Sequence, residues 1–388
     1  MNIVVIGHID HGKSTLIGRL LYDSKSLPES KISEVQKLVE EYKRRFEFGY
    51  FLDAFQDELE EERTIDTTRV TFTAGSNLHT VVDVPGHKEF IKNMLTGACN
   101  AEASILIVDV TQGIQEQTRR HAYLAKMLGI KKVIVCINKM DLVNYEPLPF
   151  EETCFEVEEL LKSLDIEPPY IIPISALQGD NIYENSKNMD WWDPFTLIQA
   201  LDSLHSEEVK KDSKLRIMVQ GPYKNYFFAK LIYQGSISKE VVTFYPSGKP
   251  VTLDAIPAFP GETLELTNQD DSVLERGDIG GQDIKPITKL TGELVLLEGQ
   301  LKLKDNLTLR CGTKKVSCQV VEIKEVLDPG TGSKLRDKTN RLKKDQAGIV
   351  TFSTNPIVVE KFSDCPELGR FILEKGSKQV GLGIVLSF

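Results

Sequence analysis

The chain has 388 residues, a length for which two or three domains are expected. No run reaches the roughly 18 apolar residues of a membrane-spanning helix, and Met1 leads directly into an apolar strand, which leaves no room for a targeting peptide. We therefore expect a cytoplasmic protein with no membrane partner. The six cysteines form no CxxC pair and have no histidine at metal-ligand spacing, so reduced structural thiols are expected at Cys99, Cys136, Cys154, Cys311, Cys318 and Cys365.

The net charge of −10 is unevenly distributed along the chain. Residues 1–209 carry 20 basic and 35 acidic side chains, whereas residues 210–388 carry 27 basic and 22 acidic ones. The acidic first part does not indicate a general affinity for nucleic acid, while the second part leaves room for a local basic surface. The candidate segment runs from Lys334 to Lys344, and we expect a solvated loop there. Its basic residues are Lys334, Arg336, Lys338, Arg341, Lys343 and Lys344.

The first element in the chain is a phosphate loop between an apolar strand and a helix. Residues 7–14 read GHIDHGKS, a complete GxxxxGK[ST] pattern, and they lie between the apolar run 2–6 and the helical stretch 15–21. In such a loop backbone N–H groups surround the phosphates, Lys13 can reach the β- and γ-phosphate oxygens, and the Ser14 hydroxyl can bind Mg²⁺. The sequence therefore predicts a nucleoside triphosphate site that includes Gly7, His8, Ile9, Asp10, His11, Gly12, Lys13, Ser14 and Thr15.

Up to about Leu204, short apolar runs alternate with segments whose apolar residues recur at helical spacing. Continuous apolar runs of this kind are typical of parallel strands that are buried on both faces. We expect an α/β domain with a doubly wound, mostly parallel sheet. The expected strands are residues 81–83, 104–109, 132–138 and 170–175, and the expected helices are residues 89–95, 115–128 and 150–164.

A second motif, Asp83-Val84-Pro85-Gly86, follows the strand at 81–83. At a strand end near a phosphate loop, the Asp83 carboxylate can hold Mg²⁺ through water, and the Gly86 N–H can approach a γ-phosphate. Taken alone, an Asp-x-x-Gly sequence is an ordinary turn. Its position after a phosphate loop favours a role in binding the triphosphate.

The third motif, Asn138-Lys139-Met140-Asp141, follows the strand at 132–138. The Asp141 carboxylate can accept hydrogen bonds from both N1–H and the N2 amine of guanine, a pair of donors that adenine lacks, and Lys139 would lie along the base plane. Ser175-Ala176-Leu177 after the next strand would complete the base pocket, with the Ala176 N–H directed at guanine O6. The motifs together predict GTP rather than ATP as the ligand.

After a polar linker at 206–212, the pattern changes to short alternating runs separated by turn sequences such as Ser247-Gly248 and Pro260-Gly261. Two β-barrels fit this pattern best. We expect a GTP-binding domain at residues 1–209, a β-barrel at 210–286 and a second β-barrel at 287–388. The expected strands in the two barrels include residues 215–219, 231–233, 251–253, 293–297, 316–321 and 348–352.

The motifs GHIDHGKS, DVPGH, NKMD and SAL resemble those of the translational GTPase superfamily, in which such a domain precedes two β-barrels. The resemblance implies binding of GTP and GDP with Mg²⁺ and hydrolysis by in-line attack of water on the γ-phosphorus. It also implies that His87 orients the water, that Asp10 helps to organise the site, and that Lys13 neutralises charge on the phosphates. The implied Mg²⁺ ligands are Ser14, Thr64 and Asp83.

The chain departs from the superfamily around Thr64. Where the family usually has Arg-Gly-Ile-Thr-Ile, this chain has Glu61-Glu62-Arg63-Thr64-Ile65. Arg63 stands where an apolar residue of the family lies beside the attacking water. One interpretation is an internal arginine finger that reaches the γ-phosphate, and the other, which we favour, is a solvated arginine in an acidic loop.

Short segments are similar to the GTPase subunit of heteromeric sulfate adenylyltransferase (ATP sulfurylase), although that subunit typically has Asp at the position of His11. Others are shared with elongation factors of the 1-alpha and Tu type. The middle barrel departs at 229–235 from the Gly-Arg-Val-x-x-Gly pattern of those factors. The segments similar to the sulfurylase subunit are residues 18–23, 64–66, 117–121 and 128–131. The segments shared by that subunit and the elongation factors are residues 179–182, 188–192, 369–373 and 381–385.

We favour the sulfurylase resemblance, and we expect this chain to be the GTPase subunit of sulfate adenylyltransferase. The resemblance implies that GTP hydrolysis drives formation of adenosine 5′-phosphosulfate from ATP and sulfate. The adenylyl transfer would then occur on a smaller, ATP-pyrophosphatase-like subunit bound to this chain. A nucleic acid partner is not expected in that case, but the sequence does not exclude one. One alternative is an elongation-factor-like GTPase that binds tRNA and the ribosome. Another is a regulatory GTPase switch that acts through contact with a protein.

Overall fold

The computed structural model describes residues 1–27, 29–30, 32–33, 35, 37, 48–51, 68–74, 77–83, 101–130, 132–204, 214–223, 226–233, 240–253, 261–267, 274–330 and 333–388. The chain divides into two compact units. The first is made up of Met1–Glu207 and Gly330–Gly332, and the second of Glu208–Pro329 and Ser333–Phe388. In the part of the chain that is described, none of the helices has the length and apolar character needed to cross a bilayer.

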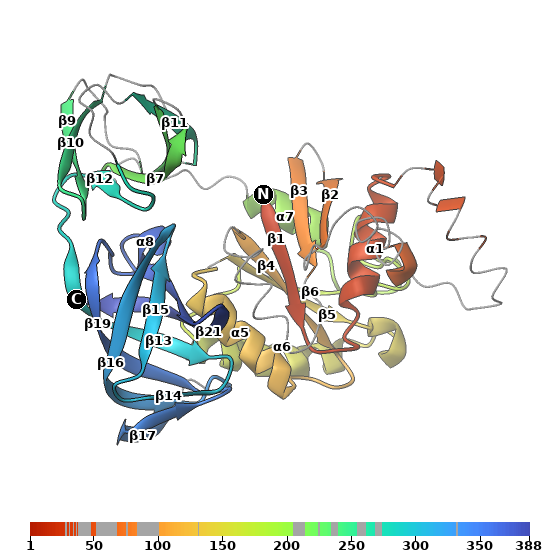
Figure 1. The fold of residues 1–388 in the computed structure, drawn as a ribbon. Helices are drawn as coiled ribbons and strands as arrows, with labels where there is room; N and C mark the ends of the chain where they lie inside the picture. Colours follow the sequence, from red (N-terminus) through yellow and green to blue (C-terminus); the bar gives the residue numbers. More distant parts are fainter. Residues whose placement is uncertain are drawn as a thin grey trace. The chain divides into compact units, whose positions relative to one another are not determined.

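The first unit is built on one six-stranded sheet with the strand order β2-β3-β1-β4-β5-β6 (Figure 1). All neighbours are parallel except β2, which runs antiparallel to β3. The central strands β1, β4 and β5 are buried along almost their whole length, as expected for strands covered on both faces. The strands are β1 (Asn2–Gly7), β2 (Thr68–Ala74), β3 (Asn77–Asp83), β4 (Ala103–Asp109), β5 (Lys132–Asn138) and β6 (Tyr170–Pro173).

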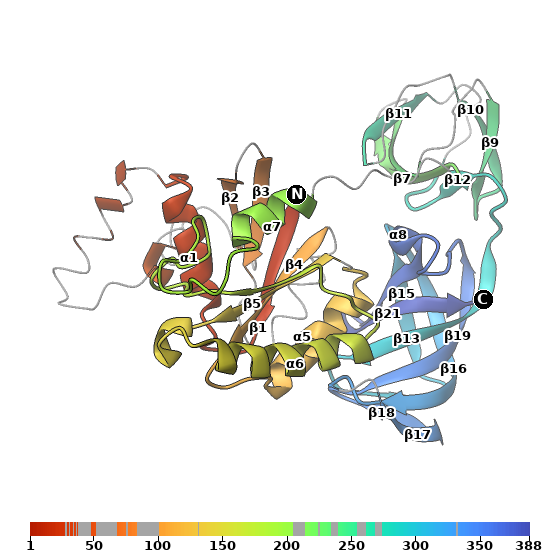
Figure 2. The same ribbon diagram turned by 180° about the vertical axis from the view of Figure 1, so that it is seen from behind.

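Helices cover both faces of this sheet, which confirms the doubly wound α/β prediction. Helices α1 (Lys13–Asp23) and α7 (Leu197–Ser203) share one apolar core with strand residues such as Ile105 and Ile134. Helices α5 (Glu116–Met127) and α6 (Pro147–Ser163) lie together against the other face (Figure 2). The short 3-10 helix η2 (Met140–Val143) follows β5, and the helix expected at 89–95 lies outside the described residues.

Residues of the predicted nucleotide site lie at one edge of the sheet because of this topology. Gly7, Asp109 and Asn138 are the last residues of β1, β4 and β5, and these three strands are neighbours and parallel. In open α/β sheets, ligands bind at the carboxyl ends of the strands. The phosphate loop and the expected base motif are therefore brought side by side.

The middle part of the second unit is an antiparallel sheet with the order β10-β9-β12-β7-β8-β11. It encloses its own apolar core, which includes Ile217, Leu231 and Phe244. The alternating runs of the sequence thus form strands, as expected for a β-barrel. The strands are β7 (Arg216–Tyr223), β8 (Tyr226–Tyr233), β9 (Glu240–Tyr245), β10 (Lys249–Leu253), β11 (Thr263–Thr267) and β12 (Ile279–Gly281).

The last part is a second antiparallel barrel with the order β15-β20-β21-β13-β19-β16-β17, closed by pairing between β15 and β16. Strands β14 and β18 form a separate pair, and α8 (Pro366–Gly369) precedes β20. The strands are β13 (Ile287–Leu296), β14 (Gln300–Lys302), β15 (Asn306–Cys311), β16 (Lys314–Leu327), β17 (Lys334–Thr339), β18 (Arg341–Lys343), β19 (Ala347–Ile357), β20 (Arg370–Lys375) and β21 (Lys378–Ser387).

The expectation of a loop at Lys334–Lys344 was wrong. Residues 334–339 form strand β17, which pairs with β16, and residues 341–343 form β18 opposite β14. The basic side chains are exposed, and their polar composition concealed a strand whose register depends on residues earlier in the chain. Lys334 forms ion pairs with Glu325 and Asp337, so part of the positive charge is compensated locally.

The two barrels of the second unit are joined by polar and apolar contacts. Arg216 on β7 forms an ion pair with Glu360 near the last barrel, and its side chain is only 5% exposed. Lys314 on β16 binds Glu275 and Asp278 of the middle barrel at 2.8 and 3.3 Å. Apolar residues from both barrels, among them Met218 and Leu368, form a shared cluster.

The five described cysteines are unpaired. Burial raises the pKa of the thiols of Cys311 and Cys318 to about 12, so both are neutral at physiological pH. Cys136 lies in the middle of β5 and is fully buried. The burial of Cys136, Cys311 and Cys318 fits the structural role that the sequence indicated for these thiols.

Candidate nucleotide-binding site

The phosphate loop requires glycine at two positions. Gly7 and Gly12 have φ angles of 149° and 95°, and a Cβ atom added at Gly12 would lie 2.4 Å from Asn138 Nδ2. A Cβ at Gly7 would lie 2.4 Å from the carbonyl oxygen of Ile107. The loop therefore lies close against β4 and β5, and α1 begins directly after it at Lys13. A helix N-terminus that follows such a loop is suited to bind phosphate.

The lysine of the loop is folded into it. Lys13 Nζ donates hydrogen bonds to the carbonyl oxygens of Gly7 and His8 at 3.2 and 2.7 Å, and the residue is 9% exposed. The ammonium group is thus held within the phosphate loop. The side chains of Asp10 and Ser14 are exposed at the same loop, which leaves the Ser14 hydroxyl accessible to a ligand.

Helix α5 supports the loop from the other face of the sheet. The Gly7 N–H donates to His121 Nδ1 at 3.2 Å, and the Ile9 N–H donates to Gln117 Oε1 at 3.4 Å. Burial lowers the pKa of His121 to about 3, so its ring is neutral and can accept this hydrogen bond. Gln117 and His121 lie in the segment that resembles the sulfurylase subunit, and no role in the site was predicted for them. Their spacing of four on one helix was the signal that they could act together.

His11 is fully buried beneath the loop. The Asp109 N–H lies 3.2 Å from His11 Nδ1, which also lies 3.4 Å from the carbonyl oxygen of Ile107. Burial lowers the pKa of His11 to about 4, so the ring is neutral. A buried backbone N–H needs an acceptor, and we therefore place the ring proton on Nε2 and leave Nδ1 free to accept from Asp109.

Asn138 joins the phosphate loop to the predicted base pocket. Its Nδ2 donates to the carbonyl oxygen of His11 at 2.8 Å, and its Oδ1 accepts from the Ala176 N–H at 2.8 Å. We expected that N–H to reach guanine O6, but in the structure it is already hydrogen-bonded to Asn138. Asp141 Oδ1 accepts from the Ser175 hydroxyl at 2.6 Å, and this contact orients the carboxylate that is predicted to recognise guanine.

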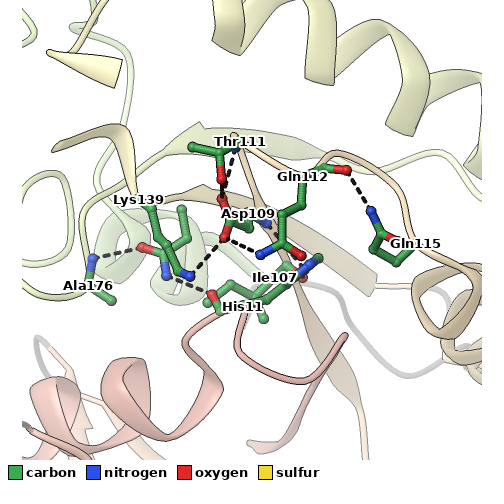
Figure 3. Close-up of polar contacts among 9 residues, drawn as sticks. His11, Ile107, Asp109, Thr111, Gln112, Gln115, Lys139 and Ala176 are labelled. Atoms are coloured by element: carbon green, nitrogen blue, oxygen red, sulfur yellow. Dashed lines mark hydrogen bonds and ion pairs between the residues drawn. The ribbon is translucent and has the colours of Figure 1, made fainter. Parts of the chain in front are cut away.

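Lys139 has a left-handed backbone conformation with φ of 67°, and its Nζ lies 2.8 Å from Asp109 Oδ2 (Figure 3). Asp109 is 1% exposed and also accepts hydrogen bonds from Thr111. Burial alone would raise the pKa of the Asp109 carboxyl, but the hydrogen bonds from Lys139 and Thr111 hold it below its usual value. Asp109 is therefore a buried carboxylate that the sequence motifs did not identify.

The loop at 175–179 is also held from helix α1. Arg19 Nη1 donates to the carbonyl oxygen of Leu177 at 3.4 Å, and Arg19 Nε contacts Asp23 at 2.6 Å. A Cβ at Gly179, whose φ is 90°, would lie 2.2 Å from Arg19 Nη2. The loop of the Ser175-Ala176-Leu177 motif and the helix after the phosphate loop thus pack closely.

Some of the predicted residues cannot be placed. Thr64, Gly86 and His87 lie outside the described residues, as does Arg63. Asp83 is the last residue of β3 at the same edge of the sheet, and only its backbone is described. Among the three predicted Mg²⁺ ligands, Ser14 is the one whose side chain is described. The roles of the others stay predictions.

Comparison with known proteins identifies the family. Residues 1–207 match the elongation factor Tu GTP binding domain, and residues 289–386 match the GTP-eEF1A C-terminal domain-like family. The chain is 36% identical to elongation factor 1-alpha of Archaeoglobus fulgidus and 34% identical to that of Pyrococcus furiosus, with 100% of this chain and 97% of each relative covered. Solved structures of Sup35 with GDP and with GMPPNP are 22% identical, with a TM-score of 0.45 over 100% of this chain and 93% of those chains.

These comparisons do not show a particular closeness to the sulfate adenylyltransferase subunit. They do agree with the described geometry, in which the phosphate loop and the Asn138–Asp141 motif meet at the carboxyl ends of neighbouring strands. The chain belongs to the translational GTPases of the elongation factor 1-alpha type, and its first domain is a GTPase domain for GTP and GDP with Mg²⁺.

Proposed function

We propose that this chain is a translation factor that binds an RNA in its GTP form and delivers it to the ribosome. The observation that carries the proposal is the extent of the similarity to elongation factor 1-alpha, which includes both barrels as well as the GTPase domain. A shared GTPase domain alone would indicate only the nucleotide chemistry. Similarity over 100% of the chain supports a shared use of the barrels as well.

In this proposal different residues of the first unit bind the phosphates, orient the attacking water and hold Mg²⁺. The loop backbone and Lys13 hold the β- and γ-phosphates, and His87 orients the attacking water. Mg²⁺ would offset the negative charge on the β- and γ-oxygens, and Ser14, Thr64 and Asp83 are the residues that would hold it. The exposed Ser14 hydroxyl at the end of the phosphate loop is suited to this role.

The sequence of the middle barrel does not indicate which RNA is bound. Residues 229–235 depart from the Gly-Arg-Val-x-x-Gly pattern, and 229–233 lie in β8, which pairs with β7 and β11. The proposal is therefore for an RNA carrier, without the assumption that the RNA is an aminoacylated tRNA. The proposed compartment is the cytoplasm, where ribosomes are found.

The sulfurylase interpretation has a narrower basis. It depends on short segments of the GTPase domain, among them 117–121. Gln117 and His121 support the phosphate loop, so this segment has a role in the GTPase domain that does not depend on sulfurylase activity. We therefore keep the complex with an ATP-pyrophosphatase-like subunit, and a purely regulatory switch, as competing outcomes.

Isolation of the native complex tests the proposal. The tagged chain, expressed at its natural level and captured with a non-hydrolysable GTP analogue, should bring down ribosomal or transfer RNA. Binding to that RNA should weaken steeply with salt, because phosphate contacts release counterions. Recovery of an ATP-pyrophosphatase-like subunit with GTP-dependent sulfurylase activity would overturn the proposal, and so would a protein partner with no RNA.

A further inference from the structure

Asp109 lies between two nucleotide-binding motifs and belongs to neither. It is the last residue of β4, next to β1 and β5, whose carboxyl ends carry the phosphate loop and the Asn138–Asp141 motif. Its side chain is 1% exposed, so a charge at this position must be compensated within the protein. Figure 3 shows that its contacts extend toward both motifs.

The carboxylate is directed at the base-recognition motif. Oδ2 lies 2.8 Å from Lys139 Nζ and accepts from Gln112 Nε2 at 3.2 Å. Oδ1 accepts from the Thr111 N–H and hydroxyl at 2.8 and 2.7 Å. With both oxygens engaged, the carboxylate has a fixed orientation, and a charge-assisted hydrogen bond of this kind strongly orients its partner.

The backbone of the same residue is directed at the phosphate loop. The Asp109 N–H contacts His11 Nδ1 at 3.2 Å, and the carbonyl oxygen of His11 accepts from Asn138 at 2.8 Å. His11 is therefore attached to the ends of both β4 and β5. A displacement of β4 at Asp109 would therefore change the positions of both the phosphate loop and the Lys139 side chain.

We infer that Asp109 is a positioning residue for nucleotide binding, which fixes the Lys139 ammonium group beside the base motif while its backbone anchors His11 of the phosphate loop. The Lys139 side chain has four rotatable carbon–carbon bonds, and a free lysine would lose that freedom only when the nucleotide binds. Asp109 restrains the side chain before binding, so less entropy is lost on binding. The inference concerns the GTPase domain alone and does not depend on the RNA partner.

The first test replaces Asp109 by Asn, which keeps the size and the backbone N–H and removes the charge. We expect the Kd for GDP, measured with a fluorescent GDP analogue, to rise about tenfold. The KM for GTP should rise by a similar factor while kcat stays within twofold, because the lost interaction contributes equally to the ground and transition states. The matched control is Asp165→Asn, which removes an exposed ion pair with Lys126 in the same unit and should leave Kd unchanged.

The second test uses Lys139→Met, which keeps the length of the side chain and removes the ammonium group. This variant leaves Asp109 as a buried carboxylate without its cation, so the melting temperature of the nucleotide-free protein should fall. Adding Asp109→Asn removes that unpaired charge and should restore part of the loss. This coupling is read from melting temperatures, without nucleotide and without activity. The fall in melting temperature of Lys139→Met itself remains measurable if the Asp109→Asn single variant folds poorly.

The two tests have distinct outcomes. A Kd for GDP within twofold of the wild type in folded Asp109→Asn, or in Lys139→Met, would overturn the inference. A fall in kcat as large as the rise in KM would show that Asp109 acts on the whole loop rather than by placing Lys139, and would also overturn it. Failure of the wild-type chain to bind RNA while it binds GDP would overturn the proposed function and would leave the inference about Asp109 standing.

Discussion

The side-chain amide of Asn138 donates a 2.8 Å hydrogen bond to the backbone carbonyl of His11, although the two residues are 127 positions apart in the chain. The same amide accepts from the Ala176 N–H, and Asn138 is 2% exposed. One side chain therefore links the phosphate loop, the end of β5 and the loop after β6. Nucleotide binding and stability of the first unit should depend on it together.

Replacement of Asn138 by Ala should weaken both properties. It leaves a buried N–H and a buried carbonyl without partners, which costs about 2 kcal/mol or more of the free energy of unfolding. The two tryptophans, Trp191 and Trp192, both lie in the first unit, so urea unfolding followed by their fluorescence reports on that unit. The Kd for GDP should rise at least tenfold. Unchanged unfolding and unchanged Kd would contradict the assigned role.

Gly12→Ala should abolish tight binding of GTP and GDP. The new Cβ would meet Asn138 Nδ2 at 2.4 Å in a backbone conformation that L-residues rarely adopt. Isothermal titration with GDP measures the effect, and a rise in Kd of roughly 100-fold or more is expected. Gly221→Ala is a suitable control, because nothing lies within 4 Å of the added atom.

Asp141→Asn should change the base that the site prefers from guanine to xanthine. The carboxylate is expected to accept from guanine N1–H and N2, whereas an amide can donate to the O2 oxygen of xanthine. Competition between GTP and xanthosine triphosphate for the same site should reverse in favour of the latter, by roughly 100-fold or more. Asp190→Asn, at an exposed residue, serves as the control. Retained preference for GTP would show that Asp141 does not recognise the base.

The first unit should lose stability on acidification because of two buried histidines. The folded pKa values of His11 and His121 are lowered from 6.5 to about 4 and about 3, so below pH 6.5 the unfolded chain binds protons that the folded chain does not. Each histidine therefore removes up to about 1.4 kcal/mol per pH unit as pH falls from 6.5 toward its folded pKa.

The variant His121→Gln tests this pH dependence, since glutamine retains an acceptor for the Gly7 N–H and does not titrate. Its free energy of unfolding, measured by tryptophan fluorescence between pH 7 and 5, should decline less steeply than that of the wild type. Above pH 6.5 the contribution of His121 is constant, so any difference between the two proteins there should not vary with pH. Parallel curves at acid pH would exclude His121 as a source of the effect.

In the second unit, Arg216→Met should destabilise the contact between the barrels. Arg216 binds Glu360 and the carbonyl oxygens of Leu215 and Gln282, and it is almost fully buried. Loss of one partner of a buried ion pair costs about 3–5 kcal/mol, which calorimetry of the full chain should detect as a lower transition temperature of the second unit. The control Lys214→Met removes an exposed pair with Asp283 and should not shift the transition.

The nucleotide chemistry could be predicted from the sequence because its motifs are local. The phosphate loop, the Asn138–Asp141 motif and the 175–177 segment each occupy a few consecutive residues, and their order along alternating strands and helices predicts that they meet at one sheet edge. The two barrels were also recognisable from alternating runs and turn sequences. The segment at 334–344 was misjudged, because β17 is an exposed edge strand whose polar side chains resemble those of a solvated loop, although it pairs with the preceding strand β16.

The contacts that support the motifs were decided by the tertiary structure. His121 reaches Gly7 across 114 positions and Asp109 reaches His11 across 98, and neither contact leaves a signature in a short stretch of sequence. Within the segment 117–121, Gln117 and His121 contact the phosphate loop, so the residues there have a structural role that does not require a sulfurylase subunit. A sequence motif determines which groups can bind a nucleotide. The folded chain decides which buried side chains orient them, because that depends on strands and helices that meet only after folding.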